Sequence, residues 1–569
     1  MKNKKILVAH PRRAHSFAAI SAPFAIASLV VCASIAGTSV KAAEPDGPDT
    51  LISEQDALEF QLMQKIKTAF SNKTAYGKDL RRSVRNYYLD RNRQPIWLTK
   101  KGLSPKAKTL MKEIEKGDEY GLKVEDIKFP SKKLASGTPA ERAEAEIMMS
   151  RAVLTYAKRA KGGHLVPQKI SRYLDNTPPT PDAAKVLAEL SDTNSPAKLL
   201  LTYHPKHPQF WSLKKQLDAY KSAVGKTEKI IKIPNGPTIQ PFDMHPDVAI
   251  LRKRFKQKVP MRGNKPLFPI DSYDSHLADA VKKFQAANGL RANGIINRST
   301  RAKLNKGKPN RIKQILANME RWRWMPEELG DFHIRVNVPE YLVRVTKDNK
   351  IIHTERVITG KKRNATPTFS DEMETVVFNP YWNVPQSIIW NEMGGVAPRG
   401  YQSRVVNGRV FIRQPPGPRN ALGIVKFLFP NRHSVYMHDT PTKPLFNKQV
   451  RAFSHGCMRL RDPLKMAEIV LKENKISRKK INAMVRNGKN QQIPLKNKIP
   501  VHVSYFTAWV GDDGKTTYFN DIYGHDKRVI SALEGRPMGL EPKTRIARRP
   551  KPVEKPSSGT NFLTYFFNN

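Results

Sequence analysis

The pattern of apolar positions divides the chain into a helical first half and a strand-rich second half. Between residues 51 and 232 apolar residues recur every three or four positions, which is the spacing of amphipathic helices. One helix is expected to begin after Ser53, a favourable N-cap residue, and another to run from about Pro139 to Ala160. No residues in this region have catalytic spacing. We therefore interpret residues 51–232 as a helical scaffold domain.

A second, smaller helical segment is predicted at residues 236–306. Phe284-Gln285, Gly289-Leu290 and a turn from Asn293 to Thr300 precede its last helix. This order resembles the small three-helix peptidoglycan-binding module, although Asn293 and Asn297 stand where the module usually has Asp and Gly. The resemblance implies glycan binding. The alternative is that the segment serves only as a spacer.

The hydrophobic period changes to two after a connecting helix at residues 309–325. Short alternating runs begin at Phe332 and recur through residues 326–535, which predicts a mostly β domain, either a sandwich or a barrel. Residues 501–509 and 515–519 flank a turn at Asp512-Asp513-Gly514, so they are expected to form a hairpin that completes the same sheet. The whole chain is thus predicted to be a multidomain α+β protein.

The N-terminus has the three parts of an export signal in residues 1–43. Five basic residues precede an apolar run from Phe17 to Ala36, and Val40-Lys41-Ala42 offers a small-residue cleavage site. The apolar run is also long enough for an uncleaved inner-membrane anchor. Both interpretations predict a periplasmic or other cell-envelope location for the remaining chain.

The chain is strongly basic, with 100 Lys and Arg residues against 50 Asp and Glu residues and a formal charge of +50. Such a charge favours anionic partners. No zinc finger, basic zipper or RNP-type motif accompanies it, so nucleic acid is not expected. The tail at residues 536–569 is rich in Lys, Arg and Pro. It is predicted to be disordered and to contact anionic envelope material.

Candidate chemistry is concentrated in the stretch from Phe453 to Leu460. The chain has two cysteines, and Cys32 lies in the export signal, which leaves Cys457 as a lone thiol. His438 stands nineteen residues upstream at the end of a strand-like run from Ser434 to Met437, where it could act as a base. Backbone amides at His455, Gly456 and Cys457 are expected to stabilise an oxyanion. The pattern indicates acyl transfer through a thioester.

Cys457 has three alternative roles. It could be a buried structural thiol, although a His-Gly-Cys-Met-Arg sequence is polar for a core. It could bind zinc together with His438 and His455, but no further spaced ligands support such a site. A papain-like or caspase-like protease would have a different order or spacing of Cys and His. The pattern calls for no metal and no organic cofactor.

His438-Asp439-Thr440 and the run from Ser454 to Arg459 resemble the catalytic motif of the L,D-transpeptidases, which have a YkuD-type fold. The resemblance to this family extends to Thr359-Gly360-Lys361 and to the run from Asn379 to Pro385. Asp439 stands where shorter members have Gly, and the large periplasmic, YcbB-like branch often has Asp there. That branch is also similar in Lys426-Phe427 and in several other segments: Thr366-Pro367-Thr368-Phe369-Ser370, Gly417–Gly423, Thr507-Ala508-Trp509 and Asp521-Ile522-Tyr523-Gly524.

The resemblance implies a specific reaction on peptidoglycan. Cys457 would attack the bond between diaminopimelate and terminal D-alanine in a tetrapeptide stem, and a diaminopimelate amine would resolve the thioester into a 3→3 cross-link. His438 would be the general base, with its other nitrogen held by the Asp439 carbonyl. Pocket support would come from His455, Gly456, Asp439 and Arg459. A substrate subsite would use Tyr381, Trp382 and Asn383.

The resemblance also implies that residues from about 388 to 432 form a capping insertion over the catalytic domain, which could act as a lid. Peptidoglycan stem peptides and glycan would be the partners. The same thioester could instead serve a carboxypeptidase, D-amino acid exchange or protein tethering. A non-catalytic wall-binding scaffold is the alternative from another class, and an intact Cys–His pair argues against it. No pattern in the sequence indicates the oligomeric state.

Overall fold

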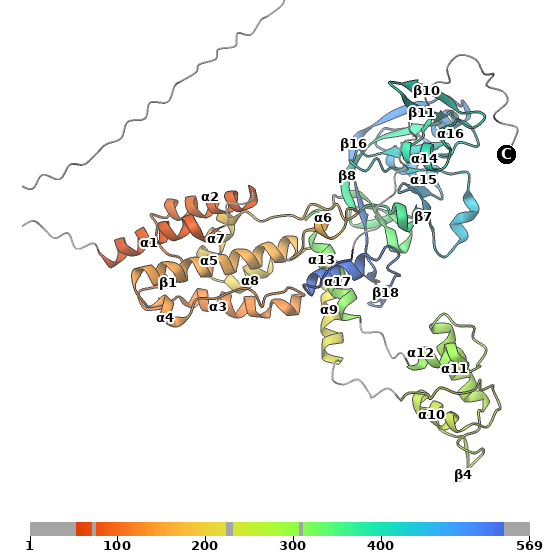
Figure 1. The fold of residues 1–569 in the computed structure, drawn as a ribbon, viewed down its shortest axis with the longest axis horizontal. Coiled ribbons are helices and arrows are strands. Elements are labelled where there is room, and N and C mark those ends of the chain that lie inside the picture. Colours follow the sequence, from red (N-terminus) through yellow and green to blue (C-terminus); the bar gives the residue numbers. More distant parts are fainter. Residues whose placement is uncertain (1–52, 71–74, 224–230, 306–310, 540–569) are drawn as a thin grey trace, which may run out of the picture. The chain divides into compact units, whose positions relative to one another are not determined.

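The computed structural model describes residues 53–70, 75–223, 231–305 and 311–539. The expected export segment and all but the first four residues of the basic tail lie outside these ranges. The described chain comprises a helical region, a small helical module and a C-terminal, mostly β domain (Figure 1). The multidomain α+β class predicted from sequence is therefore confirmed.

The first region is helical, as its apolar periodicity predicts. Ser53 caps the first helix by accepting a hydrogen bond from the Asp56 N–H, and Leu58, Leu62 and Ile66 are buried along one face. Helix α5 packs beside α1 and α3 (Figure 1). The helices are α1 (Glu54–Ala69), α2 (Ala75–Asp90), α3 (Pro105–Glu115), α4 (Lys132–Ala135), α5 (Pro139–Gly162), α6 (Pro167–Ile170), α7 (Ala183–Asp192), α8 (Pro196–Leu201) and α9 (Pro208–Ala223).

The small module contains three helices, α10 (Pro246–Phe255), α11 (Ser275–Ala287) and α12 (Arg298–Asn305), with a short hairpin of β3 (Met261–Arg262) and β4 (Lys265–Pro266). Gln285 ties the predicted turn together: its side chain accepts from the Gly294 N–H at 2.8 Å and donates to Thr300 at 3.1 Å. Ile233 is buried in the module's core, and its backbone bonds to Asn305. The packed unit therefore includes residues just before position 236.

The C-terminal domain is built on a nine-stranded sheet that follows helix α13 (Ile312–Arg323). The strand order is β14-β7-β15-β13-β12-β8-β16-β5-β6, and a further pairing of β6 with β7 closes the sheet into a barrel around an apolar core. The strands are β5 (Phe332–Asn337), β6 (Leu342–Lys347), β7 (Lys350–Gly360), β8 (Phe369–Phe378), β12 (Val425–Leu428), β13 (Met437–His438), β14 (Ala452–Ser454), β15 (Met458–Leu460) and β16 (Gln491–Ser504). Helices α15 (Pro463–Val470), α16 (Arg478–Arg486) and α17 (His525–Leu533) complete the domain.

The predicted late hairpin exists, but its assignment to the main sheet is wrong. Strands β17 (Ala508–Val510) and β18 (Thr516–Tyr518) form a separate two-stranded sheet. Two hydrogen bonds of 2.8 Å between Asn318 of α13 and Thr507 draw the chain away from the barrel after β16. Phe506 then stacks on Trp322 at 4.2 Å, so the hairpin packs against helices instead of extending the barrel.

The strand predicted at Ser434–Met437 is shorter and begins later than expected. Ser434 has a φ of +53°, and the Asn431 side chain accepts hydrogen bonds from the N–H groups of His433 and Val435. A side chain that satisfies backbone groups in this way favours a turn over a strand. Only Met437 and His438 pair with neighbouring strands, so the segment reaches the sheet just before the candidate base.

A small accessory sheet lies in sequence order between β8 and β12. It comprises β9 (Trp382–Asn383), β10 (Gln402–Val406) and β11 (Arg409–Gln414), with helix α14 (Gln386–Asn391) between the first two strands. A capping insertion was expected at about residues 388–432. In the structure the accessory sheet draws on residues 382–414, and Val425–Leu428 form a strand of the barrel. We refer to residues 382–414 as the cap.

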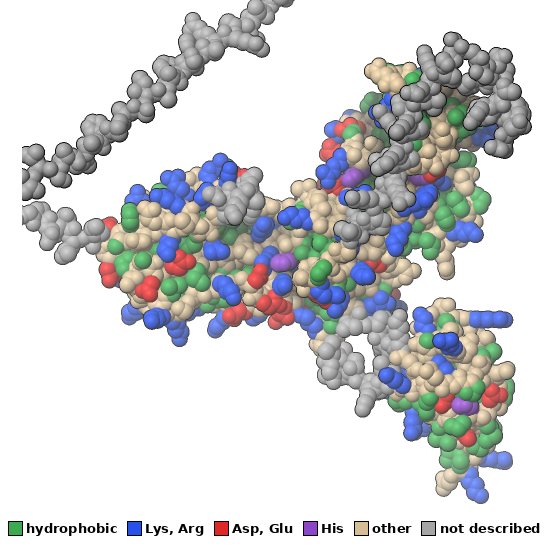
Figure 2. All heavy atoms as spheres, in the orientation of Figure 1, with side chains coloured by type: hydrophobic (Ala, Val, Ile, Leu, Met, Phe, Trp, Pro, Cys, Tyr) green, Lys and Arg blue, Asp and Glu red, His purple; other side chains and the backbone are tan. Residues whose placement is uncertain are grey.

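Lys and Arg side chains are distributed over all the described parts on the face shown in Figure 2. This agrees with the even spread of charge along the sequence. Among the described residues, no helix combines the length and the apolar character needed to cross a membrane.

Candidate active site

Two adjacent parallel strands bring the predicted histidine and cysteine to one face of the barrel wall. Met437 of β13 pairs with Met458 of β15, and His438 pairs with Arg459. Both methionines are buried in the apolar core. Because side chains alternate along a strand, His438 and Arg459 point to the opposite face, and Cys457, directly before β15, belongs to that face as well.

Three hydrogen bonds hold the loop that carries Cys457: two come from the turn between β7 and β8, and one lies within the loop. The Lys361 N–H donates to the Ser454 carbonyl at 2.9 Å, and Thr366 Oγ1 donates to the Gly456 carbonyl at 2.7 Å. Ser454 Oγ donates to the carbonyl of Cys457 at 2.5 Å. Gly456 has a φ of +124°, which L side chains rarely adopt. The backbone on both sides of the thiol is therefore fixed before any ligand binds.

The amide of Gly456 is not available to an oxyanion, contrary to the expectation from sequence. It donates to Ser454 Oγ at 3.1 Å, which closes the loop on itself. The backbone N–H groups of Tyr436 and Cys457 contact the sulfur instead, and both lower the pKa of the Cys457 thiol. Tyr436 was not singled out from sequence, because its role depends on the strand register between β13 and β15.

His438 is buried and held in one orientation. Its Nδ1 donates to the main-chain carbonyl of Asp439 at 2.5 Å, as the family resemblance implied, and this bond leaves Nε2 as the nitrogen that can accept a proton. The Asp439 carboxylate accepts from the Lys443 ammonium at 2.6 Å and from the Ile424 N–H at 3.0 Å. Asp439 thus acts on the imidazole through its backbone, while its side chain anchors the turn.

Gly423 makes room for the Asp439 carboxylate. A Cβ at Gly423 would stand 2.2 Å from Asp439 Oδ2, and the residue has a φ of +61°. We expect Gly423→Ala to lower the free energy of unfolding by about 2–4 kcal/mol, because it combines backbone strain with a clash against a fixed carboxylate. Gly408→Ala is the matched control: its φ is +70°, but a Cβ there would meet no atom within 4 Å.

Urea unfolding of both variants measures the difference. The Gly408→Ala control should lower the free energy of unfolding by only about 1 kcal/mol, the cost of backbone strain without a clash. Equal losses in the two variants would contradict the close packing of Gly423 against Asp439.

Burial keeps both partners of the Cys–His pair uncharged at neutral pH. Desolvation raises the pKa of the Cys457 thiol to about 11, and the N–H contacts and nearby cations only partly oppose it. Desolvation also lowers the pKa of His438 to about 3, assisted by the positive charge of Arg459. The resting site therefore holds a neutral thiol and a neutral imidazole on the same face of the strands.

These pKa values predict how the thiol reacts with a small neutral electrophile. The rate of Cys457 alkylation by iodoacetamide should rise roughly tenfold for each pH unit between about pH 7 and 10, because only the thiolate reacts and its pKa lies near 11. Peptide mapping by mass spectrometry separates Cys457 from Cys32. A rate that is already constant above pH 6 would instead indicate a preformed thiolate–imidazolium pair.

Two cations share the face of the thiol. Lys426 of β12 pairs in register with His438, and its Nζ lies 5.7 Å from the Tyr436 ring centre. Burial lowers the pKa of Lys426, while the sulfur of Cys457 raises it. The Nε of Arg459 is buried and has no hydrogen-bond partner among the described residues. Positive charge at this point suits a carboxylate-bearing ligand or a developing oxyanion.

The cap meets the cysteine loop through one charged contact. His455 Nε2 lies 2.5 Å from a carboxylate oxygen of Glu392, directly after helix α14. Of the predicted subsite residues, Trp382 packs edge-on against Tyr401 at 6.4 Å, and Tyr381 lies under the guanidinium of Arg413 at 4.6 Å. Asn383 lines an open cavity of about 610 Å³ in the cap. These three residues lie in or directly before the cap and are not part of the barrel wall.

Within the described ranges, no three His, Cys, Asp or Glu side chains are grouped so that they could hold a metal ion. The zinc site considered for His438, His455 and Cys457 therefore has no support from the ligand geometry.

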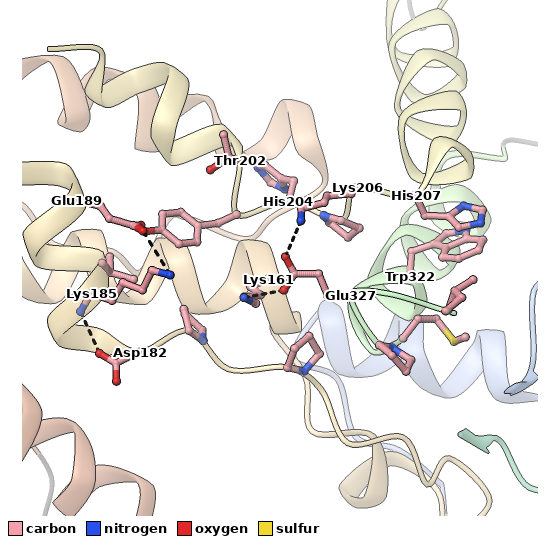
Figure 3. A pocket seen from close by; sticks show the side chains of 18 residues that line it. Lys161, Asp182, Lys185, Glu189, Thr202, His204, Lys206, His207, Trp322 and Glu327 are labelled. Carbon is pink, nitrogen blue, oxygen red and sulfur yellow. Dashed lines mark hydrogen bonds and ion pairs between the residues drawn. The ribbon is translucent and has the colours of Figure 1, made fainter. Parts of the chain in front are cut away.

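A different cavity, of about 240 Å³, lies between the helical region and the residues that follow α13 (Figure 3). Its charged side chains are paired: Glu327 binds Lys161 at 2.8 Å and Lys206 at 3.2 Å, and the Tyr203 hydroxyl donates to Glu189. His207 stacks on Trp322 at 4.0 Å. In Figure 3, dashed lines join Glu327 to Lys161 and to Lys206. Such mutual satisfaction is typical of a structural junction, so we place the candidate chemistry at Cys457.

Three parts of the chain match known protein families. Residues 82–217 match the scaffold domain, residues 245–304 match the "Putative peptidoglycan binding domain", and residues 331–501 match the L,D-transpeptidase catalytic domain, YkuD. The last match contains both Cys457 and His438.

A protein of Haemophilus influenzae named "Putative L,D-transpeptidase" is 32% identical over 250 residues, which are 39% of this chain and 50% of that protein. The chain thus spans about half the length of this relative. Among solved structures, the L,D-transpeptidase (residues 123–326) of Xylanimonas cellulosilytica is 14% identical with a TM-score of 0.15, covering 48% of this chain and 100% of its own. The Ldtfm–avibactam carbamoyl enzyme is 15% identical with a TM-score of 0.18, covering 51% and 98%.

Proposed function

We propose that this chain, which carries an L,D-transpeptidase catalytic domain and a peptidoglycan-binding domain, is a cell-wall transpeptidase whose nucleophile is Cys457. The observation that carries this proposal is the placement of Cys457 and His438 on one face of two paired strands, with the Nδ1 of His438 tied to a backbone carbonyl. A thiol and an oriented neutral imidazole are the minimum set for acyl transfer.

The proposed first half-reaction starts from a tetrapeptide stem. His438 Nε2 takes the thiol proton as the sulfur of Cys457 attacks the carbonyl between diaminopimelate and terminal D-alanine. The carbonyl oxygen gains negative charge, which the Tyr436 and Cys457 N–H groups and the two nearby cations would stabilise, because they already interact with the sulfur. The C–N bond then breaks, His438 returns the proton to the leaving amine, D-alanine departs, and a thioester remains on Cys457.

The second half-reaction reverses the roles. The side-chain amine of diaminopimelate in another stem attacks the thioester carbonyl and gives up a proton to His438. The C–S bond breaks, a new amide forms a 3→3 cross-link, and the sulfur regains the proton. The pKa of His438, near 3, keeps the imidazole unprotonated before each attack, so that Nε2 has a free lone pair.

Substrate recognition is assigned to the cations and the cap. Stem peptides carry carboxylates, for which Lys426 and Arg459 offer positive charge beside the thiol. The stem would also contact Tyr381, Trp382 and Asn383, which lie in or directly before the cap and not in the barrel wall. The Glu392–His455 contact would keep the cap against the cysteine loop. The peptidoglycan-binding domain and the basic surface would hold the enzyme on the wall, within the cell envelope.

Incubation of the purified protein with tetrapeptide muropeptides tests this function and identifies the acceptor. The expected products, separated and identified by mass spectrometry, are free D-alanine and a dimer joined through two diaminopimelate residues. Tripeptide alone would show hydrolysis, and exchange of the terminal residue would show transfer to a free D-amino acid. Absence of D-alanine release from a folded protein would contradict the proposal.

A further inference from the structure

A second pocket in the catalytic domain is lined by cations and takes no part in the proposed reaction. It has a volume of about 290 Å³ and lies at the N-terminus of helix α17, beside the turn that joins β7 and β8. Its walls include Tyr173, Tyr523 and Met538. The motif Asp521-Ile522-Tyr523-Gly524, which the sequence resemblance singled out and the proposed reaction does not use, contributes its last two residues to the lining.

An unsatisfied buried histidine lines this pocket. His525 is 2% exposed, and neither of its ring nitrogens has a hydrogen-bond partner among the described residues. An unpaired buried polar group costs roughly 1–3 kcal/mol, so such groups usually have a partner in the working state of a protein. The imidazole packs edge-on against the rings of Tyr505 and Tyr523, which fix its plane without satisfying its nitrogens.

The side chains that line the pocket carry positive charge. Lys362, Arg363 and Lys527 line it, and none of the three has a carboxylate partner in the described part of the chain. Helix α17 starts after Gly524, and a Cβ at Gly524 would meet nothing within 4 Å, so the pocket is open at this point.

The two carboxylates nearest this helix start do not neutralise the pocket. Asp526 is buried against Arg321 at 2.5 Å and accepts from the Thr507 hydroxyl at 2.7 Å. Asp521 accepts from the hydroxyl of Tyr505 and from the Lys527 N–H. Arg321 balances the charge of Asp526, and Asp521 contributes one negative charge against the three cations Lys362, Arg363 and Lys527, so the pocket keeps a net positive charge.

The pocket is connected to the cysteine loop by a short chain of hydrogen bonds. The Tyr523 hydroxyl donates to the Gly360 carbonyl at 2.5 Å and accepts from the Thr366 N–H at 3.3 Å. Thr366 Oγ1 in turn donates to the carbonyl of Gly456, next to Cys457. A ligand that packs on Tyr523 would therefore touch the framework that fixes the loop.

We infer that this pocket binds the free carboxylate end of a peptide. The cations and the unpaired His525 select an oxyanion, while the aromatic and aliphatic walls favour a ligand with a carbon chain over a bare inorganic anion. Under the proposed function, a neighbouring stem peptide of peptidoglycan supplies this carboxylate end. Only this source of the ligand rests on the proposed function. The pocket would then be a second contact with peptidoglycan, separate from the acylation site.

Calorimetric titration of full-length Cys457→Ala protein tests the inference without interference from chemistry at the thiol. The probes are N-acetyl-D-alanyl-D-alanine, its C-terminal carboxamide, and inorganic phosphate. The free acid should bind and the carboxamide should not. In the Cys457→Ala protein, a second substitution, either Lys527→Gln or His525→Phe, should weaken binding of the acid about tenfold or more, because each removes a donor to a charged group. Lys515→Gln, at an exposed turn with a side chain 86% accessible, is the charge-matched control and should have no effect.

Three results would overturn the inference: equal binding of acid and carboxamide, no binding of the acid at its solubility limit, or binding of the acid that neither pocket variant weakens. Tighter binding of phosphate than of the dipeptide would overturn the peptide assignment and indicate a phosphate ligand. Acylation of Cys457 in the wild-type protein is measured separately, so failure here is distinguishable from failure of the proposed function.

Discussion

Replacement of Cys457 by alanine is expected to abolish covalent labelling by a carbapenem, a β-lactam that acylates nucleophilic thiols and serine hydroxyls. The wild-type protein should gain the mass of one inhibitor molecule, while the Cys457→Ala protein should keep its unmodified mass. The reason is that, under the proposed function, the sulfur of Cys457 attacks the carbonyl of the inhibitor and accepts its acyl group. Intact-mass spectrometry makes the measurement.

The loss of labelling is informative only if the Cys457→Ala protein is folded, so its fold is compared with that of the wild type. Alanine removes the sulfur without inserting volume, so the circular dichroism spectrum and the thermal midpoint should remain close to those of the wild type. A Cys457→Ala protein that is folded and still gains the inhibitor mass would exclude this cysteine as the nucleophile.

Replacement of His438 by glutamine should slow acylation by about 10²–10⁴-fold, the usual contribution of a general base. Glutamine can keep a hydrogen bond to the Asp439 carbonyl but cannot accept the thiol proton. The loss should shrink as the pH approaches 11, because the thiol then ionises without help. Stopped-flow or timed mass measurements of the acylation rate at several pH values make this comparison.

His353→Gln is the matched control for the base. His353 lies on β7 and contacts Glu355 at 3.3 Å, so its replacement removes an imidazole from the same domain but not from the site. Its acylation rate should equal that of the wild type. A His438→Gln rate within a few-fold of the wild type at pH 7 would contradict the role of His438 as base.

Local sequence patterns predicted the helices and most strands because their causes are local. Ser53 caps a helix where the sequence placed it, and Asp348 and Asn349 both adopt the positive φ of a tight hairpin turn. The late hairpin was assigned to the wrong sheet because its placement depends on Asn318 and Thr507, 189 residues apart. Periodicity carries no information about such a contact.

Only part of the candidate site was predicted, because local motifs are visible in the sequence and contacts between distant residues are not. A lone thiol, a glycine and an upstream histidine are visible in a sequence, and the resemblance to L,D-transpeptidases added the Asp439 carbonyl. The contributions of Tyr436, Lys426 and Gly423 follow from strand register and from a steric contact across the sheet. The use of the Gly456 amide by Ser454 likewise depends on loop geometry, which spacing does not reveal.

In the proposed reaction a tetrapeptide stem becomes a thioester on Cys457. Quenching the wild-type protein in acid shortly after mixing with a tetrapeptide stem traps this thioester, and intact-mass measurement and mapping of the modified peptide then detect it. We expect an added mass equal to the stem minus one D-alanine, located on Cys457 and removed by hydroxylamine. Release of D-alanine by a protein that never carries this mass, or that carries it on another residue, would exclude a thioester on Cys457.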